Sequence, residues 1–186
     1  MTAAVTKFWE RYGGKTYEGL NPKLAIYASG IDEAVHEVRP ALEKIIADMG
    51  IPCSKILLNV GDERYTKDND IRDFNNLDVA GSEGNEKQFI ILVERGKEGW
   101  NCRSLFGVAL YRSPKSKIFV LQATMRCLRS ITRDRLTASV FLSKENYDIL
   151  NSELHKNFNI EIKDIKTPRT RNAKNIRFEL RCRCEK

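Results

Sequence analysis

The sequence predicts an α/β protein with a mostly parallel β-sheet covered by helices on both faces. Short apolar segments alternate along the chain with segments whose apolar residues recur at helical spacing, which is the pattern of β-α-β units. The apolar segments are continuous rather than alternating, as expected of strands buried on both faces. The chain has 186 residues, 41% hydrophobic and 31% charged, and this suits a single globular domain with its own core.

Five strands are predicted, each a run of mainly apolar residues bounded by glycine, proline or polar residues. They span Lys23–Ser29, Lys55–Val60, Gln88–Glu94, Leu105–Tyr111 and Thr137–Ser143. Because parallel sheets bind ligands at the carboxyl ends of their strands, a site is expected in the loops that follow these five segments.

Four helices are predicted from apolar residues that return to one face. They span Asp32–Met49, Asp68–Asn75, Lys117–Ser130 and Lys144–Asn157. Asp32 is the expected N-cap of the first helix and Gly50 its stop signal, while Pro40 inside it should kink or split it. Before the third strand, Gly81–Gly84 is expected to be flexible.

Three regions are expected along the chain. Residues 1–20 read as a linker and a leading helix, residues 21–157 as the main domain, and residues 158–186 as a basic C-terminal extension. The extension is expected to form two strands, Ile160–Ile165 and Ile176–Cys184, as an antiparallel pair.

The net charge of +7 is unevenly placed. From Glu161 to Lys186 there are nine Lys or Arg against four Asp or Glu, a net of +5. Such a tail suits contacts with phosphates. A solvated basic strand pair has the same composition, so the charge alone does not separate the two interpretations.

The sequence favours neither a membrane-spanning protein nor a metal-binding protein. No run approaches the ~18 apolar residues of a membrane span, and the first 20 residues lack the apolar core of a signal peptide. Five cysteines without an export signal indicate reduced thiols in a cytoplasmic protein. The two histidines are not in ligand spacing, and Cys182 with Cys184 alone does not make a zinc site, so no metal site is expected.

The segment Gly13–Thr16 (GGKT) resembles the end of a P-loop. That motif also needs a glycine five residues before its last glycine, and Trp9 occupies this position. No apolar strand precedes the segment. The chain is therefore expected to lack a phosphate cradle of this type and to be unable to complete a hydrolytic reaction by itself.

Two other segments carry candidate chemistry. In Arg95–Asn101, two glycines three residues apart let the backbone approach a phosphate or ribose closely, although an ordinary turn is the alternative. Gln122, Arg126 and Arg129 share one face of a predicted helix that is expected to reach the same sheet edge. Guanidinium groups make forked hydrogen bonds to phosphates, so this face suits a polyanion. An ordinary solvated helix face is the alternative.

Together and in this order, these segments resemble the second RecA-like lobe of superfamily 2 helicases, especially type III restriction enzyme motor subunits and related DEAD/DEAH-like proteins. Leu24–Ala34 resembles motif IV, Ile90–Ser104 motif V and Gln122–Arg129 motif VI. The resemblance runs from about residue 20 to residue 155. It implies a RecA-like three-layer α/β/α fold.

The resemblance also implies residues that contact ATP. Arg126 and Arg129 match the motif VI arginines, which in the family reach the ATP phosphates and compensate charge on the γ-phosphate, so they are the candidate catalytic residues. Gly99, Asn101 and Gln122 join them as candidate ATP-binding residues. The implied cofactor is ATP with Mg, and the metal would be held mainly by the first lobe.

Contacts with a nucleic-acid backbone are implied as well. The candidate nucleic-acid-binding residues are Ser29, Gly30, Arg72, Lys97 and Glu98. Ser29 and Gly30 end the first strand, where motif IV meets the nucleic acid, and Lys97 and Glu98 match motif V. Arg72 lies on the helix after the second strand.

The sequence departs from the family pattern at two positions. Asn101 stands where the family usually has Asp, and Met125 replaces the motif VI glycine. Either departure fits a divergent working motor or a degenerate one. Walker A and Walker B belong to the first lobe and are absent, so the chain is expected to be a fragment of a larger ATPase, partnered by the first RecA-like lobe of the same parent chain.

The leading interpretation is the C-terminal motor lobe of a cytoplasmic ATP-dependent helicase or translocase that acts on DNA in restriction or phage defence. The alternative is a stand-alone, non-catalytic nucleic-acid-binding or interaction module with a RecA-like fold. A third interpretation is an unrelated α/β enzyme with a pocket for a small molecule.

Overall fold

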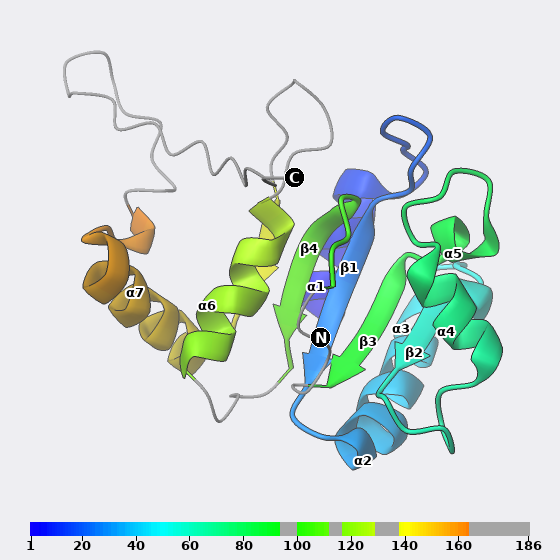
Figure 1. Ribbon diagram of the computed structural model, residues 1–186, viewed down its shortest axis with the longest axis horizontal. Coiled ribbons are helices and arrows are strands. Elements are labelled where there is room, and N and C mark those ends of the chain that lie inside the picture. The colour runs from blue at the N-terminus through cyan, green and yellow to red at the C-terminus, as the bar shows by residue number, and fades with distance from the viewer. Residues whose placement is uncertain (94–99, 112–116, 129–137, 164–186) are drawn as a thin grey trace, which may run out of the picture.

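The fold is built on one parallel sheet (Figure 1). The computed structural model describes residues 1–93, 100–111, 117–128 and 138–163. The five strands are β1 (Lys23–Ala28), β2 (Ile56–Asn59), β3 (Phe89–Val93), β4 (Leu105–Leu110) and β5 (Ser139–Phe141). They pair in the order β2-β3-β1-β4-β5, and every pair is parallel. The five predicted strands and the parallel sheet are confirmed.

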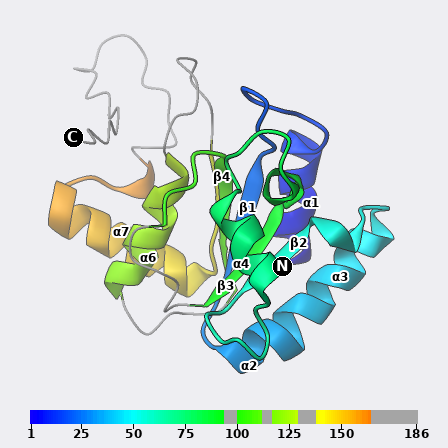
Figure 2. The same cartoon turned by 45° about the vertical axis from the view of Figure 1, so that its right-hand side comes forward.

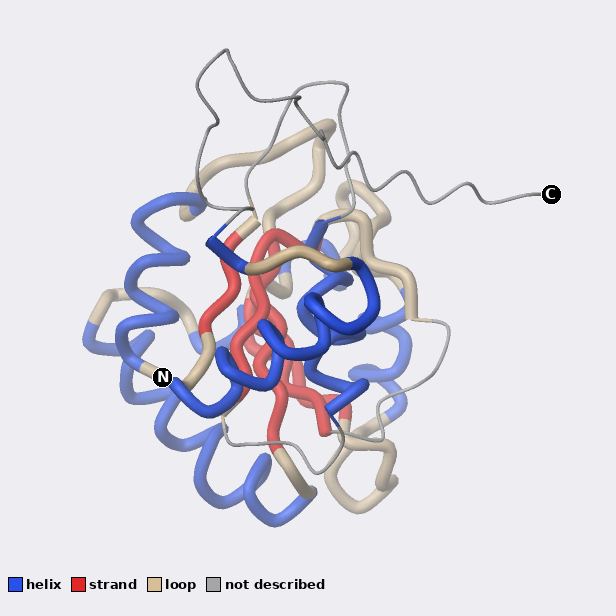
Figure 3. The backbone as a smooth tube through the Cα atoms, turned by 90° about the vertical axis from the view of Figure 1, so that its left-hand side faces the viewer, coloured by secondary structure: helices blue, strands red, loops and turns tan. Residues whose placement is uncertain are grey.

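Helices cover both faces of this sheet (Figure 3). They are α1 (Thr2–Tyr12), α2 (Ile31–Glu33), the π-helix η1 (Ala34–Val38), α3 (Arg39–Asp48), the 3-10 turn η2 (Cys53–Lys55), α4 (Asp68–Asn75), α5 (Glu83–Glu86), α6 (Lys117–Met125), the 3-10 turn η3 (Arg126–Leu128) and α7 (Lys144–Phe158). One apolar cluster joins the sheet to α1, η1 and α3, and a second joins it to α4, α6 and α7. α6 and α7 lie side by side (Figure 2).

The strands are apolar because both of their faces are covered. Every residue of β1, β3 and β4 is buried. In the sheet, Ile26 of β1 lies between Ile91 of β3 and Ala109 of β4. Neighbouring positions face the two apolar clusters in turn, which explains why the sequence shows continuous apolar runs.

The helical stretch from residue 31 to residue 48 is continuous, with a π-helix before Pro40. Proline has no N–H and its ring clashes with the carbonyl four residues earlier. The helix does not break here. It forms a wider π-helical turn, in which the Arg39 N–H donates a hydrogen bond to the Ala34 carbonyl, five residues earlier. Gly30, not Asp32, is the N-cap. Gly50 follows the last turn with φ +70°, as a stop signal should.

The helix α1 packs on the sheet through buried aromatic side chains. Phe8 meets Phe89 edge-on, with ring centroids 6.1 Å apart, and Tyr12 meets Phe106 at 5.2 Å. Gly107 of β4 lies under this contact, and a Cβ there would come within 3.0 Å of the Phe8 ring. The predicted boundaries near residues 20 and 157 remain predictions.

One local expectation is wrong in part and another is wrong. Within the stretch Gly81–Gly84, Gly81 is exposed, but Gly84 is packed, because it is buried in α5 and a Cβ there would collide with the Asp73 carbonyl and the Asn76 backbone. Residues 160–163 do not form a strand. Ile162 is buried instead, and its N–H donates to Asn151 Oδ1 of α7 at 2.9 Å. The expected strand at 176–184 lies outside the described residues.

Candidate nucleotide and nucleic-acid site

Arg126 joins the two segments that resemble motifs V and VI. It begins η3 directly after α6, and its Nη1 donates a hydrogen bond of 2.5 Å to the carbonyl oxygen of Trp100. The Arg126 side chain is half-buried. Hydrogen bonds from charged donors are stronger than neutral ones. This bond therefore fixes the end of α6 against the segment that leads into β4.

Trp100 connects this contact to α4. Its side chain is only 8% exposed and stacks on Phe74 of α4, with ring centroids 5.3 Å apart and an interplanar angle of 26°. Stacked aromatic pairs add to the energy of the area that they bury. The ring of Trp100 is thus held by α4, while its carbonyl is held by Arg126.

Asp78, in the turn after α4, holds the rest of the segment. Its carboxylate accepts hydrogen bonds from the Arg103 N–H at 2.5 Å, the Ser104 N–H at 3.0 Å and the Ser104 hydroxyl at 2.5 Å. The Cys102 thiol also points at this carboxylate, at 3.6 Å. Sequence reasoning missed Asp78, because two of its four donors are backbone N–H groups, which leave no motif.

Lys23 lies beside this attachment, at the start of β1, and is wholly buried. Its N–H donates to the Ser104 carbonyl at 2.8 Å, and its Nζ donates to the Asn21 carbonyl at 2.7 Å. Burial lowers the pKa of Lys23 to about 8, while the nearby Cys102 and Asp78 oppose this fall. The signal that could have found it is a lysine within a strand buried on both faces.

The described candidate ATP-binding residues lie near one another. Asn101 directly follows Trp100, whose carbonyl receives the Arg126 hydrogen bond, and Asn101 is exposed. Gln122 is also exposed and lies on α6 one turn before Arg126. Gly99 and Arg129 lie outside the described residues. The structure thus brings Asn101, Gln122 and Arg126 into one region.

Three of the candidate nucleic-acid-binding residues, Ser29, Gly30 and Arg72, lie in the part of the chain that the structure describes. Ser29 follows β1, and its N–H and hydroxyl both donate to Glu33 Oε2, at 2.6 and 2.8 Å. Gly30 has an extended φ of −163°, which any residue can adopt. Arg72 is exposed on α4 and pairs with Glu83 at 3.0 Å.

Lys97 and Glu98, the other two candidate nucleic-acid-binding residues, lie outside the described residues. The assignment of all five residues to a nucleic-acid backbone remains a prediction.

Arg126 and Ser29 lie toward opposite edges of the sheet. α6 follows the carboxyl end of β4 and runs back toward the amino ends of the strands (Figure 1). Arg126 directly follows the last residue of α6. Ser29 follows the carboxyl end of β1. The expectation that this helix ends at the carboxyl edge is wrong, because a crossover between parallel strands must return the chain to the amino edge.

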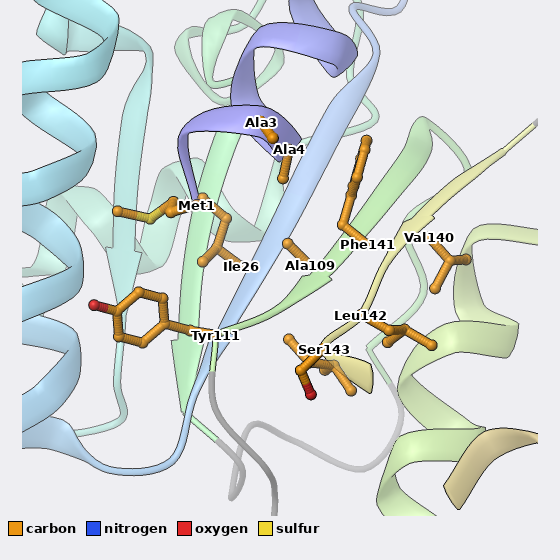
Figure 4. Close-up of a pocket in the computed structure, with 11 residues that line it drawn as sticks. Met1, Ala3, Ala4, Ile26, Ala109, Tyr111, Val140, Phe141, Leu142 and Ser143 are labelled. Carbon is orange, nitrogen blue, oxygen red and sulfur yellow. The ribbon is translucent and has the colours of Figure 1, made fainter. Parts of the chain in front are cut away.

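A pocket of about 460 Å³ lies on the other face of the sheet, beside α1 (Figure 4). Its lining is mainly apolar and includes Met1, Ala4, Ile26, Ala109 and Phe141. None of the candidate residues lines it. The pocket therefore adds nothing to the site around Arg126.

Two other classes of site were sought in the part of the chain that the structure describes. Within residues 1–93, 100–111, 117–128 and 138–163, no cluster of three or more His, Cys, Asp or Glu side chains could hold a metal ion. In the same residues, no helix combines the length and apolar character that crossing a membrane requires.

Comparison with known proteins identifies the fold. No family model and no curated protein matches the chain. Among solved structures, the chain is similar to domain 2 of the DEAD-box helicase Mss116p bound to an RNA duplex, with a TM-score of 0.57, 17% identity and 87% of this chain covered. The chain spans 55% of the length of that chain. The chain therefore has a RecA-like α/β fold.

Proposed function

We propose that the chain is the C-terminal motor lobe of an ATP-dependent helicase or translocase that acts on DNA in restriction or defence. The contact between Arg126 and the Trp100 carbonyl carries this proposal. It joins the two segments that resemble motifs V and VI, and it does so on a RecA-like fold. A motor needs such a connection, because its nucleotide and nucleic-acid contacts must change together.

ATP with Mg would lie between this lobe and the first RecA-like lobe of the parent protein. Two residues of the described part of the chain suit this lobe's side of the ATP site. Arg126 carries several N–H donors, of which the Trp100 carbonyl takes one, and exposed Gln122 precedes it by one turn. When bound, ATP supplies a γ-phosphate whose transfer to water drives the cycle. Arg129 is the second arginine that the resemblance places there.

The grip on nucleic acid would be electrostatic and largely independent of sequence. The resemblance of the motifs to restriction enzyme motor subunits favours DNA. The similar Mss116p domain is bound to an RNA duplex. Binding to matched DNA and RNA therefore decides the substrate class.

The proposal is tested by fluorescence anisotropy of this chain with short DNA and RNA oligonucleotides, single-stranded and double-stranded. A lobe with about three phosphate contacts should lose ~40-fold in affinity between about 50 and about 200 mM salt. Stronger binding to DNA than to RNA supports the full proposal. Stronger binding to RNA overturns the DNA part, and no salt-sensitive binding to either overturns the nucleic-acid role.

A stand-alone binding or interaction module is the second candidate. Met125 in place of the motif VI glycine and Asn101 in place of Asp favour it, together with the basic segment after residue 160. Adding a partner chain that carries Walker A and Walker B separates the two. Nucleic-acid-stimulated ATP hydrolysis in the mixture supports the motor, whereas binding without hydrolysis supports the module.

A further inference from the structure

We infer that Arg126 is a positioning residue, which holds the segment 100–104 in place. The resemblance alone gives this arginine a role at ATP. The inference concerns contacts within this chain and does not depend on the proposed function.

The first step is the hydrogen bond itself. Arg126 Nη1 lies 2.5 Å from the carbonyl oxygen of Trp100. With Arg126 in place, the tryptophan residue is 8% exposed. A buried carbonyl without a partner is costly. The guanidinium therefore stabilises the segment through the main chain of Trp100.

The second step is the set of attachments that the segment makes on its other side. The ring of Trp100 stacks on Phe74 of α4. Beyond it, the N–H groups of Arg103 and Ser104 bond to Asp78, in the turn that follows α4. The segment is thus fixed to α4 and its turn, and Arg126 is its attachment to the end of α6.

The third step is the direction in which the Arg126 charge acts. Tyr27 is a buried residue of β1 on the face of the sheet that α6 covers. Burial raises the pKa of Tyr27, and the charge of Arg126 works against that rise. The direction of this effect agrees with the position of Arg126 at the end of α6, on the same covered face of the sheet.

Amide hydrogen exchange tests the positioning role without any activity. In Arg126→Ala, exchange of the Arg103 and Ser104 N–H groups should become about 10- to 100-fold faster, as expected when a charged hydrogen bond is lost. Amides in β1 and β3 should exchange at unchanged rates. Arg126→Lys keeps a positively charged donor group and should restore most of the protection. Arg39→Ala, which removes an exposed arginine paired with Glu43, is the matched control and should change neither region.

Unchanged exchange at residues 103 and 104 in a folded Arg126→Ala overturns the positioning role. If Arg126→Ala does not fold, Arg126→Lys decides, because a folded lysine variant with the wild-type exchange pattern supports the role of the bond. A folded lysine variant with protection lost throughout the sheet shows a general structural role and overturns the inference.

Kinetics of the native ATP-hydrolysing polypeptide separate a positioning role from direct action on the nucleotide. Arg126→Ala should raise the KM for nucleic acid about 10-fold, with a smaller change in kcat. A loss of kcat with an unchanged KM would overturn the positioning role. A wild-type polypeptide without ATP turnover overturns the proposed function, whereas the exchange experiment still decides the positioning role.

Discussion

Replacing the buried lysine of β1 should change how stability depends on pH. Lys23 is wholly buried, and burial lowers its pKa from 10.5 to about 8. In the unfolded chain the same ammonium group is in water and keeps its ordinary pKa. Between these two pKa values the unfolded state binds more protons than the folded state, so stability rises with pH.

The size of the effect follows from the two pKa values. At about pH 7 Lys23 is charged in the folded state, and the full free-energy cost of burying its charge lowers stability. As the pH rises through the folded pKa, Lys23 loses its proton and part of this cost disappears. From about pH 7 to about pH 9, Lys23 should add about 1.4 kcal/mol to the free energy of unfolding. The Cys102 and Cys127 thiols, whose pKa values burial raises to about 12, lower stability as the pH rises through the ordinary thiol pKa of about 8.5. Both thiols are present in the wild type and in Lys23→Met, so this loss cancels in the difference between them.

Urea unfolding followed by tryptophan fluorescence at about pH 7, 8 and 9 measures this contribution. The wild-type free energy of unfolding minus that of Lys23→Met should increase by about 1.4 kcal/mol across the range. Lys7→Met removes an exposed lysine of α1 and should leave the pH dependence unchanged. Parallel pH curves for the wild type and Lys23→Met would refute the reasoning, because they would mean that Lys23 does not titrate here.

Two further substitutions test the packing around α4 and β2. Gly84→Ala should lower the free energy of unfolding by about 1–3 kcal/mol, because its Cβ would collide with the backbone at the end of α4. Gly30→Ala, where a Cβ meets nothing within 4 Å, should stay within about 0.5 kcal/mol of the wild type, and similar urea midpoints for the two variants would contradict this. Thr66→Val removes the hydroxyl that accepts the Val60 N–H at 3.0 Å and should cost about 1–3 kcal/mol. Thr66→Ser should recover most of that loss, and equal losses in the two Thr66 variants would contradict the role of the hydroxyl.

The sheet could be predicted from the sequence because its strands are buried on both faces. A short, continuous apolar run such as Phe89–Val93, bounded by polar residues, is typical of a strand in the middle of a parallel sheet. The predicted ends were one or two residues too long in several strands. Residues such as Ser29 follow the last residue that is hydrogen-bonded to a neighbouring strand. The sequence does not show where this hydrogen bonding between strands ends.

Helical detail depended on contacts that periodicity does not show. Pro40 signals a disturbance, but whether the helix breaks or forms a π-helix depends on how residues 34–38 pack against the sheet. Gly84 looks like a flexible glycine, and only the nearby backbone of α4 shows that it is a close contact.

The candidate site was predicted in part. The resemblance to motifs V and VI found the two segments that Arg126 and Trp100 bring together. It did not predict that Arg126 donates to the main-chain carbonyl of Trp100, because every residue has a backbone carbonyl and the sequence does not mark this one. Asp78 and Lys23 were missed for the same reason, since main-chain groups are among their partners.

The most direct test of the central claim is nucleic-acid-stimulated ATP turnover of the native polypeptide that carries this chain. We predict that DNA raises turnover in the wild type. Arg129→Ala should lose at least about 10³-fold in stimulated turnover, the scale of an arginine finger, and retain ATP binding. Stimulated turnover in Arg129→Ala equal to that of the wild type would contradict the assignment of this chain as a motor lobe.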